Sequence, residues 1–209
     1  DVRLVSIVHT SPVTGMTVDL EKITKEVRNV APDCIIIVDG IQHSSHGAID
    51  VQKYDIDGYV VSPYKMFSRH GYGVAWASER LCTLNKEQLA DGPFQNWELG
   101  TRDAGSYATF SDVVDYLDWL GSNFTESENT RERLEASSLA IRSHEQELVD
   151  LVLNGNEDIG GLRNNNEIRI IGNPASKSRE GVVSFFHKNK PSSIIAVSYT
   201  HLRAHETDR

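Results

Sequence analysis

The apolar run at residues 35–38 consists of four β-branched residues and stops abruptly at Asp39-Gly40. A continuous apolar run of this length, bounded by turn residues, is typical of a strand buried on both faces of a parallel sheet. A second run, Gly58–Val61, ends just before a segment that contains Lys65, and a third run lies at residues 73–77. Ligands of open α/β sheets bind at the carboxyl ends of the strands. We therefore expect Asp39 and Lys65 at neighbouring strand ends, where a ligand would lie.

The chain begins with a strand–helix–strand pattern. Residues 4–8 form another β-branched run, which we interpret as a buried strand, and residues 19–30 carry apolar side chains at helical spacing. Asp19 suits the N-cap of that helix. Followed by the strand at residues 35–38, these elements predict a βαβ unit, which is right-handed in nearly all proteins.

The second half of the sequence has a helical pattern, followed by short strands. A first helix is predicted to end at Gly121, and Thr125 with Glu128 forms a capping box for a longer helix that ends at Asn154-Gly155. Residues 168–171 and 182–186 are predicted strands.

Composition excludes several classes of function. The 209 residues carry a net charge of −9, which disfavours non-specific nucleic-acid binding, and 39% hydrophobic with 24% charged residues describe a soluble globular protein. No apolar run approaches the roughly 20 residues of a membrane span. Cys34 and Cys82 provide no disulfide framework, so we expect a cytoplasmic protein. His43 and His46 lack a carboxylate or cysteine at ligand spacing, and we predict no metal site.

An acid and an amine at adjacent strand ends suggest a cofactor that needs both groups. Pyridoxal phosphate (PLP) forms a Schiff base with a lysine through its aldehyde, and its ring nitrogen pairs with a carboxylate. Neither residue would indicate a site alone, because strand-end carboxylates often cap turns and a single lysine is usually a solvated surface residue.

Three motifs follow one another in this region. The segment from Val38 to Gln42, with His46, reads V-D-G-I-Q-x-x-x-H; it is followed by S-P-Y-K, which ends at Lys65, and then by G-Y-G-V. This ordered set resembles the class V aminotransferase and cysteine desulfurase family of fold-type I PLP enzymes. That family has V-D-G-x-Q-x-x-x-H, then S-x-H-K, then a Gly-x-Gly-Val strand, and the spacing from Asp39 to Lys65 needs no gap.

The resemblance implies a role for each motif residue. Lys65 would form the Schiff base and later move protons, and Asp39 would keep the ring nitrogen protonated. Gln42 would contact the phenolic oxygen of the cofactor. Ser62 would bind its phosphate, and Tyr64, which replaces the family's His, would supply another phosphate hydroxyl.

A later segment, W-E-L-G-T, ends at Thr101 and resembles the family's F-E-x-G-T. In relatives, this Thr reaches the cofactor phosphate of the neighbouring subunit, which implies a homodimer with shared active sites. Arg102, which follows it, could meet a substrate carboxylate, but we interpret it as a surface residue. Near the front of the chain, the loop from His9 resembles H-x-S-N-x-x-G, but Pro12 replaces the Asn that lies near the cofactor. His9 could touch the substrate or the cofactor, but a lone loop histidine is more often structural, and we interpret it so.

The resemblance also implies the fold class and domains. The chain is expected to be α/β, with the second half of the large parallel-sheet PLP-binding domain at residues 1–110 and the start of the small α+β C-terminal domain at residues 111–196. Residues 197–209 look like a translated sequencing adapter. We therefore expect a truncated fragment that is inactive by itself.

The expected function is that of a PLP-dependent enzyme acting on an amino acid through Lys65. Desulfuration, transamination, epimerisation and hydrolysis all occur in the family, and a shared fold does not choose among them. The alternative is a non-catalytic relative that serves as a binding or scaffold protein. Pro12 and Tyr64 favour this alternative, and the presence of both Asp39 and Lys65 argues against it.

Overall fold

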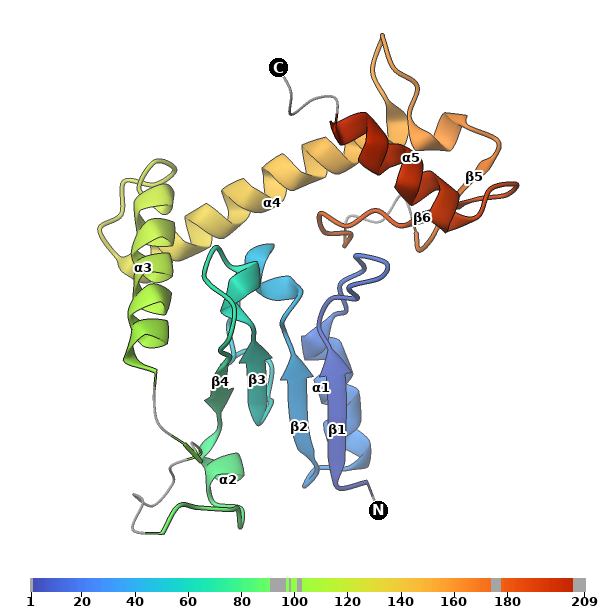
Figure 1. The fold of residues 1–209 in the computed structure, drawn as a ribbon. Helices are drawn as coiled ribbons and strands as arrows, with labels where there is room; N and C mark the ends of the chain where they lie inside the picture. The colour runs from blue at the N-terminus through green and yellow to red at the C-terminus, as the bar shows by residue number, and fades with distance from the viewer. Residues whose placement is uncertain (1, 91–96, 98, 101–102, 174–177, 205–209) are drawn as a thin grey trace. The chain divides into compact units, whose positions relative to one another are not determined.

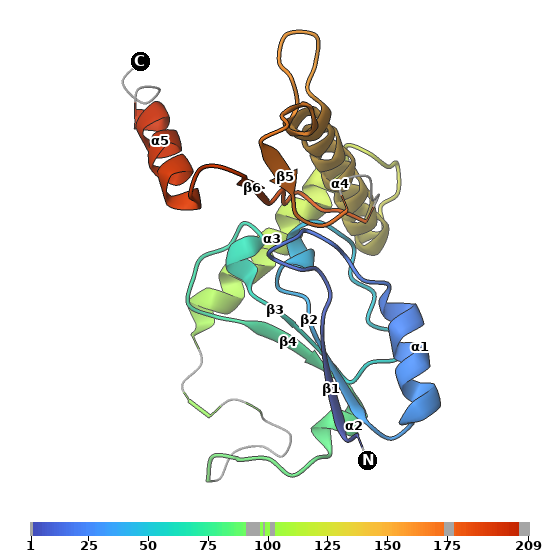
Figure 2. The same ribbon diagram turned by 90° about the vertical axis from the view of Figure 1, so that its right-hand side faces the viewer.

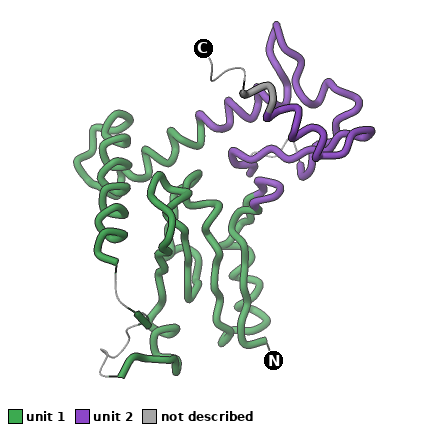
Figure 3. Tube along the Cα trace, in the orientation of Figure 1, with its two compact units in different colours: residues 1–11, 17–143 green, residues 12–16, 144–209 purple. Residues whose placement is uncertain are grey.

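The computed structural model describes residues 1–209 except 1, 91–96, 98, 101–102, 174–177 and 205–209. The chain forms two compact units: unit 1 contains residues 1–11 and 17–143, and unit 2 contains residues 12–16 and 144–209 (Figure 3). Unit 2 therefore contains a short segment near the N-terminus as well as the residues after 143. The domain bounds expected from the sequence, 1–110 and 111–196, stay a prediction.

Unit 1 is built on a four-stranded sheet in the order β1-β2-β3-β4 (Figure 1). Strands β1 (Leu4–Val8), β2 (Ile35–Asp39) and β3 (Gly58–Val61) are parallel, with Val8 opposite Asp39 and Asp39 opposite Val60. Strand β4 (Val74–Ala77) runs antiparallel to β3, because the connection between them contains no α-helix to return the chain. The carboxyl ends of β1, β2 and β3 therefore meet at one edge of the sheet, as expected.

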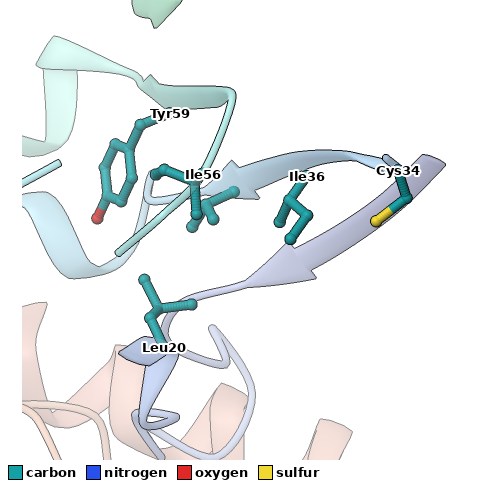
Figure 4. Packing of buried hydrophobic residues seen from close by; sticks show 6 residues of the cluster. Leu20, Cys34, Ile36, Ile56 and Tyr59 are labelled. Atoms are coloured by element: carbon teal, nitrogen blue, oxygen red, sulfur yellow. The ribbon is translucent and has the colours of Figure 1, made fainter. Parts of the chain in front are cut away.

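Helix α1 (Leu20–Val30) covers one face of this sheet (Figure 2). It begins where the Asp19 side chain accepts a hydrogen bond from the Lys22 N–H at 3.0 Å, which confirms the predicted N-cap. The core on this face is a cluster of six buried residues, Leu20, Cys34, Ile36, Val38, Ile56 and Tyr59 (Figure 4). The βαβ unit packs this cluster between α1 and the sheet.

The opposite face of the sheet is less covered than the sequence suggested. Leu4 and Val8 of β1 are 59% and 46% exposed, and Ile35 and Ile37 of β2 are half-buried. The prediction that β1 is a buried strand is wrong for this face within the described residues. A β-branched run shows that a strand forms, but it does not show whether both of its faces are covered.

The remaining described elements follow in chain order. They are α2 (Glu79–Cys82), α3 (Ala104–Gly121), α4 (Thr130–Asn154), β5 (Ile168–Ile170), β6 (Phe185–His187) and α5 (Ser192–Ala204), with 3₁₀ turns η1 (His43–Ser45), η2 (Pro63–Lys65) and η3 (Leu162–Asn164). Strands β5 and β6 form an antiparallel pair in unit 2. None of the helices in the described ranges is both long and apolar enough to span a membrane.

Two local predictions in the second half need correction. Helix α4 begins at Thr130 rather than after a capping box at Thr125, because the Asn129 side chain accepts from the Glu132 N–H at 3.2 Å. The strand expected at residues 182–186 is reduced to β6, since its first residues turn to contact other parts of unit 2. The predicted helix end at Asn154-Gly155 is confirmed, and Gly155 has φ +79°, which glycine adopts without strain.

A buried carboxylate holds the amino end of the sheet. Asp57 directly precedes β3, and its side chain is 3% exposed. It accepts hydrogen bonds from Arg80 Nε at 2.7 Å, Arg28 Nη2 at 3.0 Å and the Ile36 N–H at 2.8 Å. Burial by itself would raise the pKa of Asp57, but the hydrogen bonds from Arg80, Ile36 and Arg28 outweigh it and lower the pKa to about 2.

Replacing Asp57 by Asn should lower the free energy of unfolding by about 3 kcal/mol, because Arg28 and Arg80 lose the buried negative charge and one of its two acceptor oxygens. The folded-state pKa lies below the ordinary value of 3.8, so the contribution of the carboxylate is complete above that pH and disappears as the pH falls toward 2. The difference between the unaltered chain and the variant should shrink by about 2 kcal/mol across this window. Urea unfolding followed by tryptophan fluorescence measures both effects.

Asp55→Asn is the matched control for Asp57→Asn. The Asp55 side chain is 74% exposed and lies 3.3 Å from Arg28 Nε. Its loss should cost less than about 1 kcal/mol. Equal destabilisation by the two variants would contradict the role assigned to the buried carboxylate.

Candidate active site

Main-chain hydrogen bonds connect the carboxyl ends of β1, β2 and β3. The His9 N–H donates to the Asp39 carbonyl at 2.9 Å, and the Gly40 N–H donates to the Val60 carbonyl at 2.9 Å. A Cβ atom on Gly40 would lie 2.3 Å from the Tyr59 hydroxyl, so only glycine fits at this position. The turn after β2 is thereby held close to β3.

Lys65 and Gln42 meet at this edge. Lys65 Nζ donates to Gln42 Oε1 at 2.7 Å, and the Gln42 amide nitrogen lies 3.0 Å from His46 Nε2. Since the amide NH₂ donates to the imidazole, the amide oxygen is turned toward the lysine. His46 thus orients Gln42.

Asp39 lies on the same edge with its carboxylate available. Its Oδ1 accepts from the Ile41 N–H at 3.0 Å, which closes the tight turn after β2. Within the described residues, no cationic side chain pairs with this half-buried carboxylate. A half-buried carboxylate in this position can accept a charge-assisted hydrogen bond from a ligand.

Ser62 and Tyr64 flank the lysine in sequence. Ser62 precedes η2 and makes no capping hydrogen bond with its hydroxyl. Tyr64 is 41% exposed, and its ring stacks on that of His70 with centroids 4.4 Å apart. Phe67 has φ +69°, an unusual conformation for a bulky residue, so the loop after Lys65 carries backbone strain. The hydroxyl groups of Ser62 and Tyr64 lie on the same short loop as the amine of Lys65.

His9 belongs to a buried aromatic cluster. Its Nδ1 lies 2.8 Å from the Tyr59 hydroxyl, and its ring lies against His43 with centroids 3.7 Å apart. A cavity of about 310 Å³ lies beside the two imidazoles, and Tyr54 and Arg142 also line it. The predicted site residues Asp39, Gln42, Ser62 and Lys65 are absent from its lining. These contacts support the structural interpretation of His9.

Thr101 and Arg102 lie outside the described residues, so their predicted roles stay predictions. The next described residue, Asp103, caps α3 by accepting from the Ser106 N–H at 3.3 Å. It also forms an ion pair with Arg69, which lies in the loop after Lys65. Hydrogen bonds from Ser106 and Arg69 lower the pKa of Asp103. The start of α3 is thereby tied to the lysine loop.

Sequence reasoning missed three residues that shape this edge. His43, His70 and Arg69 were given no role, yet His70 contacts Tyr64, Arg69 ties the loop after Lys65 to Asp103, and His43 joins the turn that carries Gln42 to His9. The only available signal was that they are polar residues close to the motif. The residues that they contact lie elsewhere in the same loop or on other elements, so the spacing of the motif residues does not indicate them.

The sequence profile of the family described as aminotransferase class-V matches residues 1–199. The chain belongs to the class V aminotransferase family. Among curated class V relatives, a probable cysteine desulfurase 2 of Mycobacterium leprae is 24% identical over 199 residues, covering 88% of this chain and 42% of the relative. A cysteine desulfurase of Wigglesworthia glossinidia brevipalpis is 38% identical over 79 residues, which are 38% of this chain and 19% of the relative.

Solved structures show the same class V fold. The cysteine desulfurase CsdA of Escherichia coli superposes with a TM-score of 0.64 at 20% identity, covering 91% of this chain and 45% of that one. An apo cysteine desulfurase of Thermococcus onnurineus NA1 gives 0.62 at 20% identity, covering 95% and 48%. This likeness confirms the predicted fold-type I class. The chain spans less than half the length of these relatives.

Proposed function

We propose that this chain is part of a PLP-dependent enzyme that acts on an amino acid, with Lys65 as the residue that attaches the cofactor covalently. The observation that carries the proposal is the contact of Lys65 Nζ with Gln42 Oε1 at 2.7 Å, on the strand edge that also presents Asp39. Membership of the class V family supports it. The amine, the amide and the carboxylate are the groups that the family motif supplies.

The described residues fit this cofactor chemically. PLP, when bound, withdraws electrons from the α-carbon of an amino acid, provided that its ring nitrogen stays protonated. Asp39 is suited to hold that proton, since its carboxylate has a free acceptor and no competing cation among the described residues. Gln42 is suited to contact the phenolic oxygen, because its amide already reaches the attachment amine.

Lys65 would react with the cofactor and then move protons. It donates to a neutral amide, so no ion pair has to be broken before the amine attacks. Ser62 and Tyr64 carry hydroxyl groups on the same loop and would bind the phosphate. The substrate would be an amino acid, and the reaction would be one of those found in the family, such as transamination or desulfuration.

We also propose a cytoplasmic location, which cell fractionation can test, because both cysteines are free.

Replacing Lys65 by Ala should abolish covalent attachment of PLP. The test uses the chain together with any coding sequence that flanks it in its gene, borohydride reduction, and mass spectrometry of the peptides. The unaltered protein should be yellow and carry the phosphopyridoxyl group on Lys65. Lys53→Ala is the control, since Lys53 is an exposed lysine paired with Asp50. Fixation of PLP on the Lys65→Ala protein would show that another lysine is the attachment residue.

Replacing Asp39 by Asn should leave attachment intact and slow turnover. The amide keeps an oxygen that can accept from the Ile41 N–H, so the turn persists, but it cannot hold the ring nitrogen protonated. The loss should be about 30- to 1000-fold in rate, measured by single-turnover kinetics with amino acids. Asp33→Asn, in an exposed turn before β2, is the control. Normal turnover of Asp39→Asn would leave Asp39 as a turn residue only.

A homodimer with shared sites follows from the proposed role of Thr101. If Thr101 reaches the phosphate of the partner, mixing the Lys65→Ala and Thr101→Ala proteins should restore part of the activity, because each hybrid dimer keeps one intact site. Refolded mixtures are compared with each parent and with a Lys65→Ala plus Thr83→Ala mixture. That control should recover activity whether or not sites are shared, because the Thr83→Ala protein is intact. No gain of the test mixture over its parents would contradict a shared site.

A further inference from the structure

Arg179 in unit 2 is a buried arginine held entirely by main-chain carbonyls. It is 2% exposed. Its Nη1 donates to the carbonyls of Thr14 at 2.7 Å and Val182 at 2.9 Å, and its Nη2 donates to the carbonyl of Ile171 at 2.8 Å. No carboxylate pairs with it in the described part of the chain, and burial lowers its pKa. The guanidinium therefore joins three separate segments of unit 2.

One of these segments is the connection between β1 and α1. Residues Pro12–Met16, called the strap below, belong to unit 2 although they interrupt unit 1 in sequence. The Glu180 N–H donates to the Gly15 carbonyl at 2.9 Å, and the Ser184 hydroxyl donates to the Val13 carbonyl. Gly15 has φ +70°, and a Cβ there would lie 2.6 Å from the Val182 carbonyl oxygen. The strap is thus held at three consecutive residues, Val13, Thr14 and Gly15.

The strap continues directly into residues that contact the turn after β2, which carries Gln42. The His9 ring lies against that of His43, and Thr10 Oγ1 lies 3.5 Å from His43 Nδ1. His43 is the neighbour of Gln42 in sequence, and Gln42 accepts the hydrogen bond of Lys65 Nζ. A contiguous series of covalent bonds and contacts therefore runs from the strap to the amine. Spatial continuity alone is not coupling, so the link has to be measured.

We propose that Arg179 is a positioning residue for Lys65. By holding the strap, it fixes the ends of the β1–α1 connection, and through His9, Thr10 and His43 it fixes the amide that orients the amine. This inference rests on the proposed function of Lys65. Releasing the strap should loosen the main chain around His9 and change the surroundings of Lys65 Nζ without removing any residue that touches the cofactor.

The test compares two ways of releasing the strap with a matched control. Arg179→Leu removes the guanidinium, and Ser184→Ala removes only the hydroxyl bonded to Val13. Arg163→Leu is the control, because Arg163 lies in the same unit and bonds to the Asn154 side chain at 2.7 Å. Ser184→Ala carries the test if Arg179→Leu fails to fold.

The first measurement is amide hydrogen exchange. The His9 N–H donates to the Asp39 carbonyl, and the Val18 N–H donates to the His9 carbonyl, both at 2.9 Å. Exchange at these two amides should accelerate about fivefold to thirtyfold in the strap variants and stay unchanged in Arg163→Leu. Unchanged exchange in the strap variants would overturn the proposal.

The second measurement is the pH dependence of the Lys65 amine itself. Labelling by acetic anhydride across a pH series, followed by mass spectrometry, gives the pH midpoint of its amine without any cofactor. With PLP bound, the pH midpoint of the visible absorbance reports the same residue. Both midpoints should shift in the strap variants and not in the control. Faster amide exchange with unshifted midpoints would show that the strap is only structural. Failure of the unaltered protein to bind PLP would contradict the proposed function, while the labelling result would still decide the inference.

Discussion

The buried carboxylate of Asp57 joins three elements of unit 1 to the start of β3. It links α1 through Arg28, the start of β2 through the Ile36 N–H, and α2 through Arg80, at the point where β3 begins. A buried carboxylate is costly unless it is paired and hydrogen-bonded, and here it has partners from three elements. The relative positions of β2 and β3, on which the opposite edge depends, are thereby set at the amino end of the sheet.

The two edges of the sheet have different properties. At the amino edge, the Asp57 carboxylate is paired with Arg28 and Arg80. At the carboxyl edge, Asp39 keeps an acceptor without a cation among the described residues, and Ser62 makes no capping bond. Polar groups held in this way contribute little to stability, and they are suited to bind a ligand. Stability of the strand ends comes instead from the apolar cluster around Ile36 and from the main-chain bonds of His9 and Gly40.

Much of this arrangement could be predicted from local sequence. The β-branched runs located β1, β2 and β3, the helical repeat located α1 with Asp19 as its cap, and motif order placed Asp39 and Lys65 on one edge. These features depend on residues that are close in sequence. The pairing of Asp57 with Arg80, the open face of β1 and the partners of Arg179 depend on contacts between distant segments, and no local pattern specifies them. The start of α4 was missed because Asn129 competes with Thr125 as a cap.

The division of the chain into units has a consequence for recombination between relatives. Unit 2 is not a continuous stretch of sequence, since the strap supplies the carbonyls that Arg179, Glu180 and Ser184 bind. A chimaera joined after residue 143 would combine the strap of one parent with the guanidinium of the other. Residues 144–209 alone would keep the buried arginine but lose one of its acceptors. A workable exchange of the C-terminal part therefore has to transfer residues 12–16 together with it.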